Sequence, residues 1–151
     1  MNKLVVRSDI VKCMDCACFN LRKTARAITH FYDEMLRPTG LRTTQFTLLV
    51  ATMMLGPITV TRLARVGVMD RTTLTRNLRP LERQGLIKAA LGKDHRTRVV
   101  TFTPEGQKAL SQALPLWKKA QALIVKELGQ DRWNSLRADL GELVSIVAKK
   151  G

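Results

Sequence analysis

The chain has 151 residues and carries 26 Lys and Arg residues against 12 Asp and Glu residues, so its formal charge is +14 at pH 7. A charge this far from zero exceeds what solubility requires and attracts polyanions. The hydrophobic fraction of 45% excludes a disordered basic tail, and the aromatic fraction of 5% disfavours a single-strand binder that stacks bases. We therefore expect one globular chain, residues 1–151, that binds double-stranded DNA.

No apolar run reaches the roughly 18 residues that a membrane helix needs. The longest candidate, residues 46–56, is interrupted by threonines and ends at a glycine. The N-terminal segment carries charges where a signal peptide needs an apolar stretch. We therefore expect a cytoplasmic protein without a membrane partner.

A long amphipathic helix is predicted from Ser8 to about Arg37. Ser8 and Asp9 can cap its start, and Pro38 with Gly40 can end it. Its apolar residues alternate at spacings of four and three, the period of a helix that packs along another helix. These residues are Met14, Cys18, Leu21, Ala25, Ile28, Tyr32 and Met35.

Residues 41–103 form a block with the order typical of a helix-turn-helix. We expect one helix over Thr43–Leu55, ended by the Gly-Pro pair that follows it, and a short helix over about Thr59–Arg65. Gly67 makes the turn, and Asp70 caps the next helix. This block is the predicted DNA-binding lobe.

The helix after Asp70 has two distinct faces. Leu74, Leu78 and Leu81 share one face, which we expect to be buried. The opposite face is polar and basic, and it could read DNA in a groove. Its members are Thr72, Arg76, Arg79 and Arg83, flanked by Thr73 and Thr75. Pro80 removes one backbone hydrogen bond inside this helix, so we expect a bend or an early end there.

A basic hairpin follows this helix directly. Leu86–Leu91 and Arg98–Phe102 read as two strands, and the loop Gly92–Thr97 between them forms a wing. We expect its charged residues to take part in DNA binding, namely Lys93, Asp94, Arg96 and Arg98.

The C-terminal third is predicted to form two further amphipathic helices. Pro104 opens the first, and the second follows Gly129. Long helices at both ends of a short chain, over 8–38 and 104–149, suggest one dimer interface that the two termini build jointly. The expected fold is therefore mainly α with a small β-wing, a winged helix-turn-helix homodimer.

The helix-turn-helix stretch LARVGVMDRTTLTRNLRPLERQGLI and the wing KDHRTRVVTFTPEG, with its Asp-x-Arg and Thr-x-x-Gly motifs, resemble the MarR family. The order of helices extends this resemblance over essentially the whole chain. It implies a winged-helix homodimer on pseudo-palindromic operators, usually a repressor, that lets go when a small molecule or oxidant reaches a site between the dimer helices and the DNA-binding lobe. The resemblance also implies that Arg96 enters the minor groove while Asp94 holds it in place.

The chemistry of the basic face suggests how its residues divide between bases and phosphates. Arg76 can pair bidentately with guanine, and the threonines can contact thymine methyl groups. The residues better suited to phosphate are Arg62, Arg71, Arg83 and Lys93.

Three cysteines lie close together, at positions 13, 16 and 18. The run from Cys18 to Leu21, with Tyr32 further along the helix, is similar to the hydroperoxide-sensing branch of the family, in which such a Cys is oxidised and such a Tyr bonds it. On one straight helix Cys18 and Tyr32 would lie about 21 Å apart, so their contact must cross between subunits. Arg22 stands where that branch has a second tyrosine, and a nearby cation favours the thiolate.

The cysteines have two other interpretations, as small apolar filler and as metal or metalloid ligands. On a continuous helix Cys18 lies roughly 140° round from Cys13, so one helix cannot bring all three thiols together. A zinc site also lacks an obvious fourth ligand, because the two histidines are His30 and His95 and the latter belongs to the wing. We therefore expect no metal site within one chain and no cofactor, while capture of a metalloid by cysteines of both subunits stays open.

His30 could line an effector pocket with Phe46 and Arg22, whose cation suits an aromatic carboxylate, although a lone His in a helix is more often structural. Two other classes of function remain open. A sequence-tolerant architectural DNA-binding protein would need only the charge. An enzyme that uses the cysteines is the least favoured, because the sequence has no catalytic triad, metal motif or phosphate-binding glycine loop.

Overall fold

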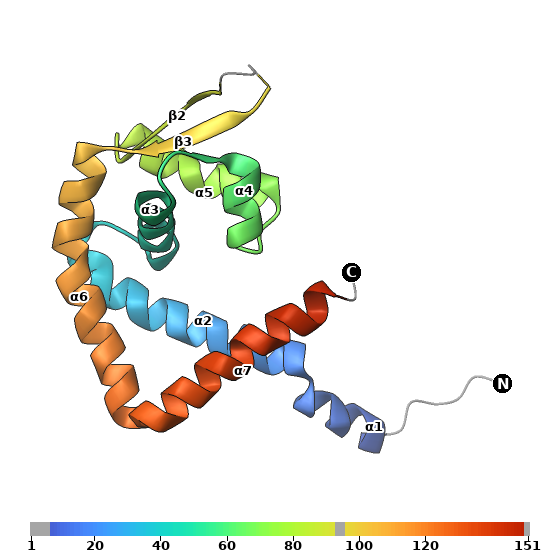
Figure 1. Ribbon diagram of the computed structural model, residues 1–151. Coiled ribbons are helices and arrows are strands. Elements are labelled where there is room, and N and C mark those ends of the chain that lie inside the picture. Colours follow the sequence, from blue (N-terminus) through green and yellow to red (C-terminus); the bar gives the residue numbers. More distant parts are fainter. Residues whose placement is uncertain (1–6, 93–95, 150–151) are drawn as a thin grey trace.

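The protein is described by a computed structural model that covers residues 7–92 and 96–149 (Figure 1). Its helices are α1 (Arg7–Lys12), α2 (Ala17–Leu36), α3 (Thr43–Leu55), α4 (Val60–Val66), α5 (Arg71–Arg83), α6 (Pro104–Leu128) and α7 (Gln130–Ala148), with short 3-10 turns η1 (Cys13–Asp15) and η2 (Arg37–Thr39). Its strands are β1 (Ile58–Thr59), β2 (Ile87–Leu91) and β3 (Arg98–Phe102). The fold is thus mainly helical with a small sheet, as predicted.

The elements divide into two parts, which α6 connects (Figure 1). Helices α3, α4 and α5 lie with the β2–β3 hairpin at one end, and the long helices α2 and α7 lie at the other. Helix α6 packs against both α2 and α3. Among the described helices, none combines the length and the apolar character that crossing a bilayer requires.

The prediction of one unbroken N-terminal helix from Ser8 is wrong. Helix α1 begins at Arg7, so Ser8 and Asp9 are helical residues rather than caps, and it ends at Lys12. The chain then passes through η1, and Cys16 has an extended ψ of 123° before α2 begins. The cysteines therefore do not lie on one continuous helix.

The side chain of Asn20 stabilises this break. Its Nδ2 donates hydrogen bonds to the carbonyl oxygens of Met14 (2.8 Å) and Cys16 (3.0 Å). An asparagine that bonds nearby backbone in this way offers an alternative to the regular helical pattern. The other end of α2 agrees with the prediction, because Gly40 at φ 72° closes the η2 turn that follows it.

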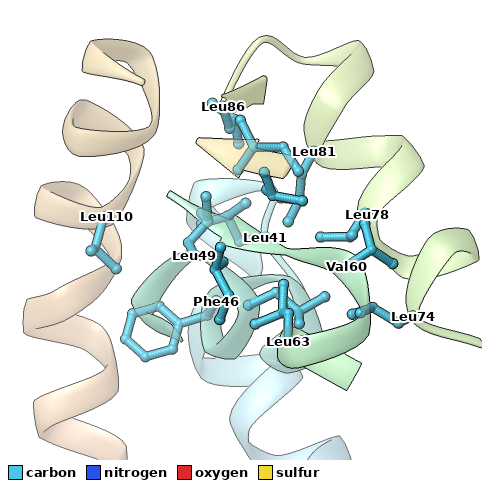
Figure 2. Packing of buried hydrophobic residues seen from close by; sticks show 14 of the residues in the cluster. Leu41, Phe46, Leu49, Val60, Leu63, Leu74, Leu78, Leu81, Leu86 and Leu110 are labelled. Carbon is cyan, nitrogen blue, oxygen red and sulfur yellow. The ribbon is translucent and has the colours of Figure 1, made fainter. Parts of the chain in front are cut away.

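A leucine-rich core holds the predicted DNA-binding lobe together (Figure 2). Helix α3 lies at its centre and contributes Phe46 and Leu49, and α5 contributes Leu74, Leu78 and Leu81, each at most 4% exposed. The inward face of α5 is therefore the predicted one. Burial of a whole leucine side chain contributes about 1.5–3 kcal/mol to folding, so these side chains fix how α5 lies on the lobe.

Side-chain caps set the start of both helices of the helix-turn-helix. Thr59 Oγ1 accepts a hydrogen bond from the Arg62 amide (3.2 Å), and Asp70 accepts one from the Thr73 amide (2.8 Å). The capping role predicted for Asp70 is thus confirmed. Between the helices Val68 adopts φ 50°, the one positive φ among the described residues other than glycine.

Of the bend or early end predicted for α5 at Pro80, the early end is wrong, because the helix continues to Arg83. Proline lacks the N–H that would bond four residues back, but the following turn is held by other bonds. Gln84 N donates to Pro80 O (3.1 Å), and Leu86 N donates to Leu81 O (2.9 Å). Burial of the leucines on the inward face compensates for the missing bond.

The sheet has three strands in the order β1–β3–β2, all antiparallel. The two strands of the hairpin were predicted. In the structure Leu91 lies opposite Arg98 beside the wing loop, and Ile87 lies opposite Phe102 at the other end of the hairpin. Strand β1 was not predicted, because two residues are too few to show a period. Its pairing of Ile58 with Val100 joins the start of α4 to the wing.

Candidate nucleic-acid interface

The outward face of α5 forms a basic, hollowed surface. Because α5 buries its leucines, residues at the intervening positions point away from the lobe. Five of these residues line a hollow of about 540 Å³, namely Arg71, Thr72, Thr75, Arg76 and Arg79. We call these five residues the recognition stripe. All five belong to the predicted set of DNA-binding residues.

The three threonines of α5 differ in what their hydroxyls do. Thr73 Oγ1 donates to Asp70 Oδ2 (2.6 Å), so it completes the cap. Thr75 Oγ1 donates to the Arg71 carbonyl oxygen (2.7 Å) one turn back. The Thr72 hydroxyl has no hydrogen bond within the described part of the chain. The three threonines thus differ in the hydrogen bonding of their hydroxyls.

The hydrogen bonds from Thr73 also act on the charge of the capping residue. They hold the pKa of the Asp70 carboxyl below its ordinary value, with the side-chain bond from Thr73 as the largest cause and its backbone bond next. Asp70 therefore stays ionised at neutral pH. Its negative charge lies at the N-terminus of α5, where it is favourable to the helix dipole.

The wing is closed at its base by one short backbone bond, from Gly92 N to Thr97 O (2.7 Å). A Cβ on Gly92 would lie 2.7 Å from Thr97 Oγ1, so any larger residue would require the Thr97 side chain to shift. Arg96 is exposed beyond this point. Lys93 and Asp94 lie outside the described residues, so the expected support of Arg96 by Asp94 stays a prediction.

Arg98, which was predicted to bind DNA, is engaged within the chain. Its Nη2 lies 2.8 Å from Oε1 and 2.8 Å from Oε2 of Glu82, a residue near the end of α5. The predicted site does not include Glu82. Glu82 follows Arg79 by three residues in the sequence, and this spacing could have indicated that it lies near the basic face of α5. Its pairing with Arg98 joins two elements, so only the tertiary structure shows it.

Two other predicted phosphate contacts lie at the margins of the stripe. Arg62 is exposed in the first turn of α4, and Arg83 is exposed in the last turn of α5. Along the chain, Arg62 precedes the recognition stripe and Arg83 follows it, one from each helix of the helix-turn-helix.

The predicted effector residues are not brought together in one pocket of this chain. His30 lines a polar hollow of about 290 Å³ beside Asp33 and Arg37, and Phe46 lines an apolar one of about 260 Å³ beside Trp117. The Phe46 and Trp117 rings stack with centroids 5.9 Å apart. Arg22 lines neither hollow.

The cysteines and Tyr32 are also apart. Cys13, Cys16 and Cys18 are exposed thiols, so within one chain they are not core filler. Tyr32 is buried, and its hydroxyl donates to Gln121 Oε1 on α6 (2.6 Å). Among the described residues, no group of three His, Cys, Asp or Glu side chains has the arrangement of a metal site.

These features define a class, the winged helix-turn-helix transcriptional regulators, and comparison with known proteins gives the family. The sequence model of the MarR family matches residues 39–97. The structure is similar to that of the Mycobacterium tuberculosis transcriptional regulator MosR in complex with DNA, with a TM-score of 0.81 and 36% identity over 89% of this chain and 97% of that one. The chain belongs to the MarR family.

Two further comparisons agree. A second crystal structure of Mycobacterium tuberculosis MosR gives a TM-score of 0.80 and 34% identity, over 91% of this chain and 98% of that one. A Bacillus subtilis protein described as an uncharacterised helix-turn-helix transcriptional regulator, YwoH, is 30% identical over 88 residues. That match spans 58% of this chain and 64% of the relative, so the chain spans less than two thirds of that relative's length.

Proposed function

We propose that the protein is a sequence-specific regulator that binds double-stranded DNA through the recognition stripe of α5. The observation that carries this proposal is the basic hollow on α5, built from three arginines and two threonines on a helix whose other face is locked into the lobe. A B-DNA major groove is about 12 Å wide and admits one α-helix. The DNA complex of the similar MosR supports the same partner.

The stripe combines the two kinds of contact that specific binding needs. Arg76 and Arg79 are exposed and long enough to reach guanine edges, while Thr75 offers a methyl group because its hydroxyl is turned to the helix backbone. Arg62, Arg71, Arg83 and Lys93 supply charge for phosphates. Arg96, on the wing, is the residue we propose for the neighbouring minor groove.

We further propose that the active species is a homodimer. The faces of α2, α6 and α7 expose apolar side chains around a groove of about 660 Å³. Its lining includes Leu21, Ile28, Ile124, Leu136 and Leu140, and a contiguous apolar surface of this kind marks an interface in a soluble protein. A second copy seated there would present two α5 helices to successive major grooves, about 34–36 Å apart on a pseudo-palindromic site.

Release from DNA is the regulatory part of the proposal. We propose a repressor that lets go when a small-molecule effector binds or when a cysteine is oxidised. The apolar hollow beside the stacked Phe46 and Trp117 rings suits a planar apolar ligand, and it lies between α3 of the lobe and α6. The exposed thiols of Cys13, Cys16 and Cys18 are open to oxidants.

One binding experiment tests the proposal. Duplexes selected from a random library by the purified protein are compared with bulk genomic DNA by fluorescence anisotropy at several salt concentrations. We expect a selected pseudo-palindrome and a specific-to-bulk affinity ratio of at least about 10³. A specific-to-bulk affinity ratio near one would contradict sequence-specific binding and favour an architectural role. A monomer in analytical ultracentrifugation would contradict the proposed homodimer.

A second experiment tests release. The bound complex is treated with an organic hydroperoxide or with a panel of aromatic acids, for the wild type and for Cys18→Ser. Peroxide release of the wild type alone would assign the sensor to Cys18, and equal release from both would exclude it. An aromatic acid that uses the hollow should raise the melting temperature of both proteins alike.

A further inference from the structure

One carboxylate stands in the basic face of α5. The helix contains Arg71, Arg76, Arg79 and Arg83, and Glu82 is its single acidic residue. Positions 72, 75, 79 and 82 follow each other at spacings of three, four and three, and position 82 also lies one turn after the buried Leu78. Glu82 is therefore half-buried at the edge of the recognition stripe. A negative charge on a surface that approaches phosphates opposes binding unless it is neutralised.

Arg98 of the wing neutralises it. Arg98 is the first residue of β3 and pairs with Leu91 at the base of the wing. Its Nη2 lies 2.8 Å from both carboxylate oxygens of Glu82, and the two side chains remain 44% and 33% exposed. The contact is therefore on the surface, and it joins α5, the proposed recognition helix, to the wing.

The ion pair with Glu82 determines whether the Arg98 guanidinium can contact a DNA phosphate. An arginine that is free to meet a phosphate adds affinity for every sequence, because counterion release does not depend on the bases. An arginine held by Glu82 adds none of this affinity, but it keeps the wing at one place relative to α5. Specific binding needs this fixed relationship, because helix and wing read neighbouring grooves.

We propose that Glu82 is a specificity-determining residue that withholds Arg98 from the DNA backbone and ties the wing to the recognition helix. The inference rests on the proposed DNA-binding function and gives the acidic residue of α5 a role in it. Glu82 limits binding to bulk DNA, so its loss raises affinity where no specific site exists.

The test compares Glu82→Gln with the wild type on a selected duplex and on bulk DNA, as a function of salt. The glutamine keeps the size of the side chain and removes its charge. On bulk DNA we expect the log–log salt slope to steepen by about 0.9 and the affinity at 0.1–0.2 M salt to rise about five- to tenfold. The specific-to-bulk ratio should fall.

The matched control is Glu34→Gln, which changes the net charge equally. Glu34 forms the same kind of ion pair, with Arg37 at 2.8 Å, but it lies on α2 away from the stripe. We expect its salt slope on bulk DNA to equal that of the wild type. If both variants steepen the slope alike, net charge explains the effect and the proposal is overturned.

Arg98→Ala provides an independent measurement on a second variant. Arg98→Ala alone leaves Glu82 without its partner, so its affinity for bulk DNA should fall. Glu82→Gln combined with Arg98→Ala removes both charges and should return to the wild-type slope, since the wild-type Arg98 does not meet phosphate under this proposal. A slope reduced by about 0.9 in the double variant would place Arg98 on a phosphate in the wild type and overturn the proposal. If the wild-type protein bound no duplex more tightly than bulk DNA, the proposed function itself would be wrong.

Discussion

Thr73 donates two hydrogen bonds to Asp70, one from its amide (2.8 Å) and one from its hydroxyl (2.6 Å), and together they fix the first turn of the recognition helix. The contact is local, yet it determines where the stripe of α5 begins. Thr72 follows directly after Arg71 in this turn, so any fraying of the cap would displace both residues.

Stability should depend on the charge of Asp70. Its pKa is lower in the folded protein than in the unfolded chain, so ionisation favours the folded state. This contribution is present above the unfolded pKa and is lost as the pH falls through the folded value, in the acid range. Asp70→Asn, which keeps a capping oxygen, should weaken this acid dependence in thermal unfolding measured between about pH 2 and pH 6. An identical pH profile for variant and wild type would contradict the role of the carboxylate.

The buried hydroxyl of Tyr32 should contribute measurably to the contact between α2 and α6. Tyr32→Phe removes its bond to Gln121 Oε1, and we expect a loss of about 0.5–1.5 kcal/mol in urea unfolding. Burial also raises the pKa of Tyr32, so its contribution is present below the unfolded pKa and is lost as the pH rises through the folded one. The phenylalanine variant should lack this alkaline loss, and Phe31→Leu, a neighbouring aromatic residue, should keep it.

The core leucines of α5 should control both stability and DNA binding. Leu74 is fully buried, and Leu74→Ala should lower the free energy of unfolding by about 2–5 kcal/mol because it leaves a cavity. Leu91→Ala is the matched control, since Leu91 is 67% exposed on β2 and should cost less than about 0.5 kcal/mol. Equal losses in chemical denaturation would show that the packing beneath the stripe is not what stabilises it.

Val68 should be replaceable with a gain in stability. A β-branched residue at φ 50° is strained, and its side chain is 75% exposed, so little burial is lost on substitution. Asparagine tolerates the left-handed region, and Val68→Asn should raise the unfolding free energy by about 0.5–1 kcal/mol. Val66→Asn, at an exposed helical position, should give no gain; a gain there too would point to surface polarity rather than to the turn.

The threonines of α5 should respond differently to isosteric substitution in DNA binding. The Thr75 hydroxyl already donates a hydrogen bond to the Arg71 carbonyl oxygen. Thr75→Val should therefore keep the affinity for the selected duplex within about threefold of the wild type, while Thr75→Ser should lose the methyl contact. Thr72→Val should weaken binding more than Thr75→Val, because it removes the hydroxyl without an internal partner. Titration of one selected duplex with all three variants decides the order, and the reverse order would exchange the two roles.

Several residues of the interface could be predicted because their signals are local. Leu74, Leu78 and Leu81 recur at the helical period, and Asp70 precedes them at a capping distance, so the faces of α5 follow from the order of the residues alone. Gly129 likewise separates α6 from α7. The break before Ala17 could not be predicted in this way, because it depends on where the Asn20 side chain bonds.

By itself, the order of amino acids determined the class of fold, the family, the buried face of α5 and the basic character of the recognition stripe, since periodicity, capping and charge are properties of neighbouring residues. The tertiary structure alone decided that Arg98 meets Glu82, that Tyr32 meets Gln121 and that His30 and Phe46 open into different hollows. Such contacts join elements far apart in the chain, and their distances depend on how whole helices pack against each other.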